Sequence, residues 1–186
     1  WALCRALQDA RTAQHIAPLR VNVNVSPIQL LSPDFAQRVL DILREQDAPA
    51  STLTLEVTES SVMQNVDLAC RHLERLREAG IHIALDDFGS GHSSLGLLAD
   101  LPFDTVKLDR SFLRDSARGG TRGALLGSSV RLAHDLGLRT VAEGVEDEDM
   151  LQLLTHYDCD AAQGYHIARP ERLEEVLGRL QALRPR

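Results

Sequence analysis

The feature that most constrains the fold is a regular alternation of short apolar strands and amphipathic helices along almost the whole chain. Such alternation is typical of parallel βαβ units with right-handed crossovers. No G-x-G-x-x-G or P-loop pattern follows a strand, which disfavours an open nucleotide-binding sheet and favours an α/β barrel. We predict strands at residues 19–26, 53–59, 81–87, 104–110, 139–144 and 160–166, and helices at about 33–46, 66–79, 123–136 and 147–156 and from about 170 onward.

Polar residues alternate with apolar ones along the predicted strands. Side chains alternate across a strand, so Thr54, Glu56 and Thr58 share one face and the apolar residues of 53–59 take the other. In a (β/α)₈ barrel the active site lies at the carboxyl ends of the strands. We therefore predict that helices cover the apolar faces and that polar strand ends meet inside the mouth of a barrel: Asn24, Glu56, Asp86, Lys107, Glu143 and Gln163.

The polar strand ends predict a metal site, because Asn24, Glu56, Asp86, Asp87 and Glu143 offer only oxygen ligands. Mg²⁺ and Mn²⁺ prefer such ligands, whereas Zn²⁺ favours His or Cys. Adjacent Asp86 and Asp87 are expected to point to different sides of their strand, so that each reaches a different ion. Two ions about 3.5–4 Å apart are the usual arrangement for in-line attack on a phosphodiester. Two kinds of role are expected for Lys107. It can act on the attacking water, by stabilising or deprotonating it, or it can be a structural ion-pair partner.

The net charge of −7 limits the possible partners. An acidic protein repels polyanions, so a surface for polymeric nucleic acid is not expected. No apolar run is long enough to span a bilayer, and no membrane contact is expected from this segment. The three cysteines are far apart and lack C-x-x-C spacing, which indicates reduced thiols in a reducing compartment.

Six motifs occur in a characteristic order: "NVNVS", "LTLEVTES", "IALDDFGSGHSS", "LPFDTVKLDRSF", "TVAEGVE" and "AAQGYHIARP". They resemble the motif series of EAL domains, which are bacterial cyclic di-GMP phosphodiesterases. The resemblance implies a modified TIM (β/α)₈ barrel over residues 1–186 that hydrolyses cyclic di-GMP to linear 5′-pGpG, using Mg²⁺ or Mn²⁺ with two ions bound. It further implies a bacterial cytoplasmic location, a homodimer, and sensory or GGDEF-type domains in a longer protein.

The resemblance also implies roles for individual residues. Asn24, Glu56, Asp86, Asp87 and Glu143 would bind metal, and Lys107, Glu143 and Gln163 would be catalytic. Lys107 would lie near the attacking water, and Gln163 would order the water or the substrate. Glu59 would hold the loop after Asp87 in place, and the glycine-rich segment 88–94 would fold over the site. Glu146 belongs to the same acidic set without a defined role.

The Glu-Ala-Leu motif on the first strand of the family does not occur in this sequence, which begins at Trp1. We expect that a longer protein carries this strand, or that the chain is a truncated domain that binds metal poorly. An alternative function is a catalytically weak or inactive cyclic di-GMP receptor that acts through partner binding. An aldolase with Lys107 as a Schiff base is disfavoured, because the surrounding carboxylates oppose a lowered lysine pKa.

Overall fold

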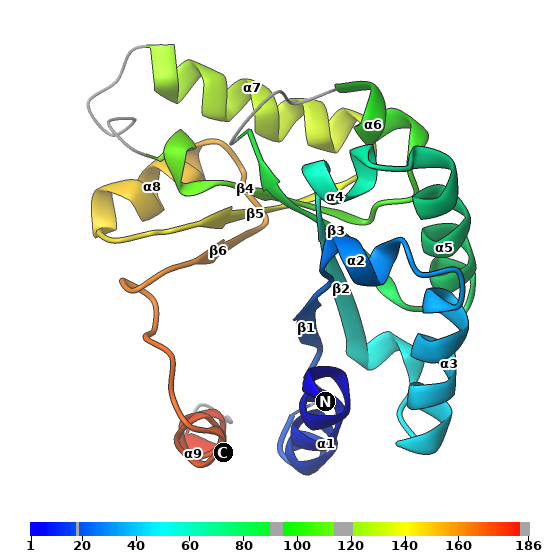
Figure 1. Ribbon diagram of the computed structural model, residues 1–186. Coiled ribbons are helices and arrows are strands. Elements are labelled where there is room, and N and C mark those ends of the chain that lie inside the picture. The colour runs from blue at the N-terminus through cyan, green and yellow to red at the C-terminus, as the bar shows by residue number, and fades with distance from the viewer. Residues whose placement is uncertain (18, 90–94, 114–120, 183–186) are drawn as a thin grey trace.

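The computed structural model describes residues 1–17, 19–89, 95–113 and 121–182, and the strands of this part form one parallel sheet (Figure 1). The strands pair in chain order from β1 to β6, and every neighbouring pair is parallel. The strands are β1 (Val21–Asn24), β2 (Leu53–Thr58), β3 (His82–Phe88), β4 (Thr105–Leu108), β5 (Arg139–Glu143) and β6 (Ala161–Gln163). The helices are α1 (Ala2–Ala13), α2 (Pro27–Leu30), α3 (Phe35–Glu45), α4 (Glu59–Met63), α5 (Val66–Glu78), α6 (Leu95–Asp100), α7 (Thr121–Asp135), α8 (Glu148–His156) and α9 (Leu173–Ala182).

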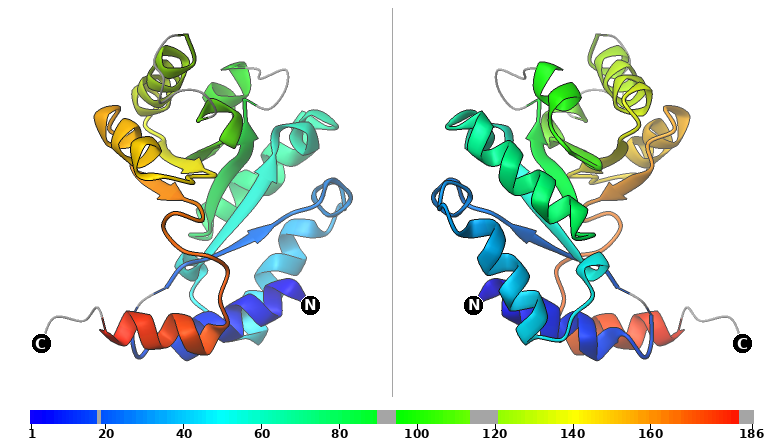
Figure 2. Two further views of the ribbon diagram at one scale, coloured as in Figure 1. Left: turned by 90° about the vertical axis from the view of Figure 1, so that its left-hand side faces the viewer. Right: turned by 90° about the vertical axis from the view of Figure 1, so that its right-hand side faces the viewer.

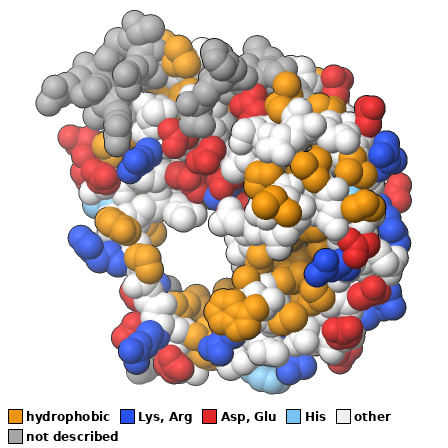
Figure 3. All heavy atoms as spheres, in the orientation of Figure 1, with side chains coloured by type: hydrophobic (Ala, Val, Ile, Leu, Met, Phe, Trp, Pro, Cys, Tyr) orange, Lys and Arg blue, Asp and Glu red, His pale blue; other side chains and the backbone are white. Residues whose placement is uncertain are grey.

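The sheet curls into part of a barrel, with α3, α5, α7 and α8 on its outer side (Figures 1 and 2). The edge strands β1 and β6 face each other across an opening, which is visible as a hollow in the space-filling view (Figure 3). The predicted fold class is therefore confirmed as an α/β fold with a partial TIM-type barrel. None of the helices in the described ranges is long and apolar enough to cross a membrane.

The two faces of the strands are sorted as the sequence predicted. In β2, Leu53, Leu55 and Val57 are at most 2% exposed and belong to the apolar core under the helices. Thr54 and Glu56 lie on the other face and are buried as well. Burial of apolar area against the helices stabilises the sheet, while the buried polar residues of β2 lie on the inside of the curl.

The start of the helix predicted at Ser32 and Pro33 is wrong. The structure instead has a short helix α2, in which Ser26 and Gln29 form a reciprocal capping box, and α3 begins only at Phe35. Ser26 Oγ accepts from the Gln29 backbone N–H, which satisfies a donor that the helix leaves unpaired. The strand predicted at 104–110 is also shorter, because Asp109 accepts from the Ser111 N–H and starts a 3₁₀ turn.

Candidate active site

Lys107 joins three strands at the centre of the polar face. Its side chain is on β4 inside the curled sheet, and the residue is 5% exposed. The Nζ atom lies 2.9 Å from Glu56 Oε2 on β2, 2.9 Å from Asp86 Oδ1 on β3 and 2.6 Å from Glu143 Oε1 on β5. The structure thus brings together four of the residues that the sequence singled out, Lys107 among them as an ion-pair partner.

The protonation state of Lys107 follows from these contacts. Burial alone would lower its pKa, but hydrogen bonds to Glu143, Asp86 and Glu56 outweigh burial and raise the pKa well above its ordinary value. The side chain is therefore a fixed positive charge. Of the roles that the sequence left open, this geometry supports charge stabilisation and ion pairing and gives no support to proton abstraction.

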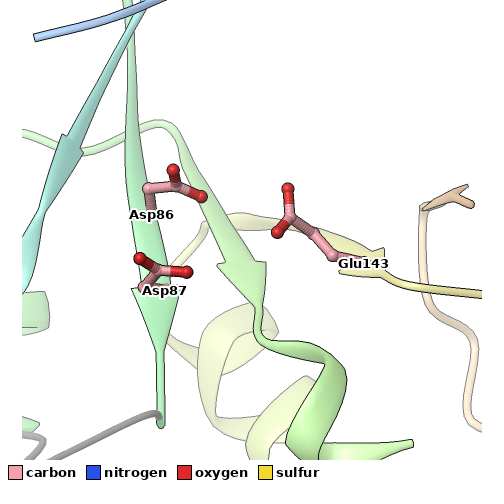
Figure 4. A group of neighbouring side chains, drawn as sticks. All are labelled: Asp86, Asp87 and Glu143. Atoms are coloured by element: carbon pink, nitrogen blue, oxygen red, sulfur yellow. The ribbon is translucent and has the colours of Figure 1, made fainter. Parts of the chain in front are cut away.

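The two adjacent aspartates do not follow strand alternation. Leu85 pairs with Val106, whereas Phe88 pairs with Leu108, so β3 has one residue more than β4 between these pairs. This β-bulge contains Asp86 and Asp87, and Asp87 has a left-handed backbone with φ of 57°. The expectation that the two side chains point to different sides is wrong, because both carboxylates turn toward Glu143 (Figure 4). Strained backbone of this kind persists where the surrounding structure enforces it, often at functional sites.

Asp86, Asp87 and Glu143 form a group that can hold a cation. One oxygen of each lies within 4.8 Å of the others. Burial and then the neighbouring carboxylates raise the pKa of Asp87, and burial raises the pKa of Glu143 against the effect of Lys107. Asp86 Oδ1 is buried, and its charged neighbour is Lys107 Nζ at 2.9 Å. Three carboxylates crowded in this way offer the oxygen ligands that a hard divalent cation such as Mg²⁺ or Mn²⁺ prefers.

Glu56 on β2 shares Lys107 with this group, and Asn24 lies on β1, the next strand along. Glu56 is 5% exposed, and its Oε1 atom accepts a hydrogen bond of 2.7 Å from Asn22 Nδ2. Asn24 pairs with Glu56 in the strand register and is exposed at the end of β1. No role was predicted for Asn22. The sequence feature that could have indicated a role is its position two residues before Asn24. This spacing places Asn22 on the same face of the strand, where its amide can reach the neighbouring strand.

The remaining predicted residues lie outside the cation-binding group. Gln163 pairs with Glu143 in the strand register and is exposed at the end of β6, Glu146 is exposed just beyond β5, and Glu59 begins α4. Residues 90–94, which form most of the predicted loop over the site, lie outside the described residues. Asp109 was not predicted as a site residue, but its charge contributes to the raised pKa of Asp87.

Comparison with known proteins gives consistent matches. A family model described as the EAL domain matches residues 1–170. A signaling protein of Caulobacter vibrioides, itself uncharacterized, is 41% identical over 170 residues, which is 91% of this chain and 21% of that protein. A protein of Pseudomonas aeruginosa named cyclic di-GMP phosphodiesterase NbdA is 39% identical over 183 residues, which is 95% of this chain and 23% of that protein. The chain thus spans less than a quarter of the length of these two relatives.

Solved structures agree with the sequence matches. The EAL domain of Mycobacterium smegmatis DcpA superposes with a TM-score of 0.92 at 33% identity, covering 100% of this chain and 85% of that one. The phosphodiesterase PaMucR, solved as a complex with c-di-GMP, superposes with a TM-score of 0.88 at 34% identity, covering 95% of this chain and 72% of that one.

Proposed function

Because the chain belongs to the EAL domain family, we propose that it hydrolyses cyclic di-GMP to linear 5′-pGpG with Mg²⁺ or Mn²⁺. One observation carries the proposal: Asp86, Asp87 and Glu143 converge within 4.8 Å at the ends of β3 and β5, next to the charged Lys107. A related chain named as a phosphodiesterase and a similar structure with c-di-GMP bound support this choice of substrate.

Asp86, Asp87 and Glu143 would hold the divalent cation, with Glu56 and Asn24 as further oxygen ligands. When bound, divalent cations lower the pKa of a coordinated water and neutralise charge on a phosphodiester. The β3 bulge preorganises two of the ligands, because it presents adjacent carboxylates on the same side of the strand. This preorganisation keeps the acidic group in place before any ligand arrives.

Lys107 would stabilise negative charge at the reacting phosphate. Its ammonium is held by three carboxylates from three strands, so its position is fixed before substrate binds. A fixed cation in a buried site stabilises developing anionic charge more strongly than one in water. Gln163 and Glu143 end neighbouring strands in register, so the Gln163 amide would orient the water or the substrate from the β6 side. Glu59 and Glu146 would support the loops around the site.

Hydrolysis of cyclic di-GMP by this chain tests the proposal. Linear pGpG should form with Mg²⁺ or Mn²⁺ and should be absent in EDTA. Glu143→Gln should lower the rate at least about tenfold, since it removes a ligand charge. Glu78→Gln, at the exposed end of α5, is the matched control and should leave the rate unchanged. Saturable binding of cyclic di-GMP without product would favour the receptor function instead.

A further inference from the structure

A cavity lies at the opposite end of the barrel from the carboxylates. It has a volume of about 470 Å³ and is formed by α1, residues 19–20 before β1, segment 47–52 and the start of β5. Residues Val21, Leu53 and Arg139 begin their strands at this end, whereas Asp86 and Glu143 are near the far ends of theirs. We propose that this cavity binds a small organic phosphate.

Three arginines from three different segments converge on the cavity. Arg11 is on α1, Arg20 precedes β1, and Arg139 begins β5. The curl of the sheet brings Arg20 and Arg139 to one cavity, although β1 and β5 are not neighbouring strands. Arg20 Nε donates to Ser51 O at 3.2 Å, and Arg11 donates to Gln46 O at 3.4 Å. These bonds hold two guanidinium groups in place, and the remaining N–H groups of each can donate to a ligand.

Some of the described arginines are paired with carboxylates, and others, Arg11, Arg20 and Arg139 among them, are not. Arg5, Arg38, Arg44, Arg77 and Arg179 each form an ion pair with a carboxylate. Among the described residues, no ion pair within 4 Å involves Arg11, Arg20 or Arg139. One acidic residue, Asp47, also lines the cavity, so the formal charge of the lining remains positive. Unpaired cations around one cavity in a chain of net charge −7 indicate a site for an anion.

The field of these arginines reaches a neighbouring histidine. Burial is the main cause of the lowered pKa of His82, and Asp104 opposes it. The charges of Arg20 and Arg139 lower this pKa further, with a contribution from Arg77. Arg77 is itself paired with Asp104 at 2.9 Å, whereas Arg20 and Arg139 form no such pair among the described residues.

The wall of the cavity indicates the rest of the ligand. Leu19 is partly exposed and Pro49 is exposed, and they give the cavity an apolar wall in front of the buried Leu7 and Ala10. A bare inorganic ion would leave this wall without a contact, whereas a small carbon skeleton would cover it. Guanidinium groups bind phosphate through paired N–H donors, and three of them suit a terminal phosphate group.

Calorimetric titration with ribose 5-phosphate and with inorganic phosphate tests the proposal. EDTA is present throughout, so that phosphate cannot bind through a metal ion at the carboxylates. The titration measures binding alone and does not depend on hydrolysis. Failure here is therefore distinguishable from failure of the proposed hydrolysis. Ribose 5-phosphate should bind saturably and more tightly than inorganic phosphate. Absence of saturable binding up to about 10 mM, or equal affinity for both probes, would overturn the proposal.

Variants then assign the binding to the arginines. Arg20→Gln and Arg139→Gln should each weaken ribose 5-phosphate binding by about tenfold or more, since each removes charge-assisted hydrogen bonds. Arg5→Gln on α1 and Glu143→Gln at the carboxylates are the controls and should bind like the wild type. Unchanged affinity in both cavity variants, with unchanged unfolding curves, would place the ligand elsewhere and refute the site.

Discussion

Lys107 Nζ and Glu143 Oε1 lie 2.6 Å apart between neighbouring strands β4 and β5, and this is the shortest of the three ion pairs of Lys107. Glu143 also belongs to the group of carboxylates that can hold a cation. The same carboxylate therefore links the buried lysine to the candidate metal site. Stability and metal binding are expected to be coupled through this pair.

Lys107→Met should destabilise the protein strongly in the absence of metal. It would leave Glu56, Asp86 and Glu143 without their shared cation, and breaking a buried ion pair costs about 3–5 kcal/mol. Mg²⁺ should then stabilise the variant more than it stabilises the wild type, because the carboxylates repel each other more. Urea unfolding with EDTA and with Mg²⁺ measures both effects.

Arg5→Met is the matched control for Lys107→Met. Arg5 pairs with Asp9 on the surface of α1, and exposed pairs contribute about 1 kcal/mol or less. Equal losses in the two variants would show that the lysine network contributes no more to stability than a surface pair.

Gly89→Ala should destabilise the end of β3 more than Gly137→Ala destabilises its turn. Both glycines have positive φ, 90° and 75°, so both substitutions strain the backbone by about 1 kcal/mol. A Cβ at Gly89 would also collide with the ring of Phe112, whereas nothing lies within 4 Å of a Cβ at Gly137. Urea unfolding of the two variants should show the larger loss for Gly89→Ala, and equal losses would contradict the close contact with Phe112.

Two features could be predicted from the sequence. They are the alternation of strands and helices, and the convergence of four polar side chains, Glu56, Asp86, Lys107 and Glu143. Both depend on local periodicity, and parallel strands bring their carboxyl ends to one edge. The orientation of Asp86 and Asp87 could not be predicted, because a bulge depends on the register between β3 and β4. The start of α3 was misplaced because Ser32-Pro33 resembles a helix start, while the capping box formed at Ser26.

The arginine cavity has no sequence signature. Arg11, Arg20 and Arg139 are far apart in the chain, and no motif contains them. Their convergence depends on how the sheet curls, which is a property of the whole fold. The same reason explains why Asp109 was not expected to influence Asp87.

Asp160→Asn should weaken the attachment of β6, which carries Gln163. The carboxylate accepts hydrogen bonds from Thr140 N at 2.8 Å, Thr140 Oγ1 at 2.9 Å and His134 Nε2 at 2.9 Å. Burial would raise the pKa of Asp160, but the hydrogen bonds from Thr140 and His134 outweigh it and lower the pKa. We expect a loss of about 1–3 kcal/mol at neutral pH.

The pH dependence gives Asp160→Asn a second readout. A lowered folded-state pKa contributes stability that is present above the unfolded pKa of about 3.9 and is lost as the pH falls through the folded value. Unfolding curves of the wild type and the variant should therefore converge below about pH 4. A gap that stays constant down to pH 2.5 would contradict this account, and Asp149→Asn on α8 should follow the wild type throughout.

The most direct test of the central claim is the rate of pGpG formation by Asp87→Asn in Mg²⁺, compared with Asp149→Asn. Asn tolerates the left-handed backbone at this position, so the substitution removes the charge and keeps the bulge. The account predicts a fall of about 100-fold or more for Asp87→Asn, with unfolding stability equal to or above that of the wild type because repulsion with Asp86 and Asp109 is relieved. A rate equal to that of Asp149→Asn would contradict the assignment of the β3 bulge and the end of β5 as the active site.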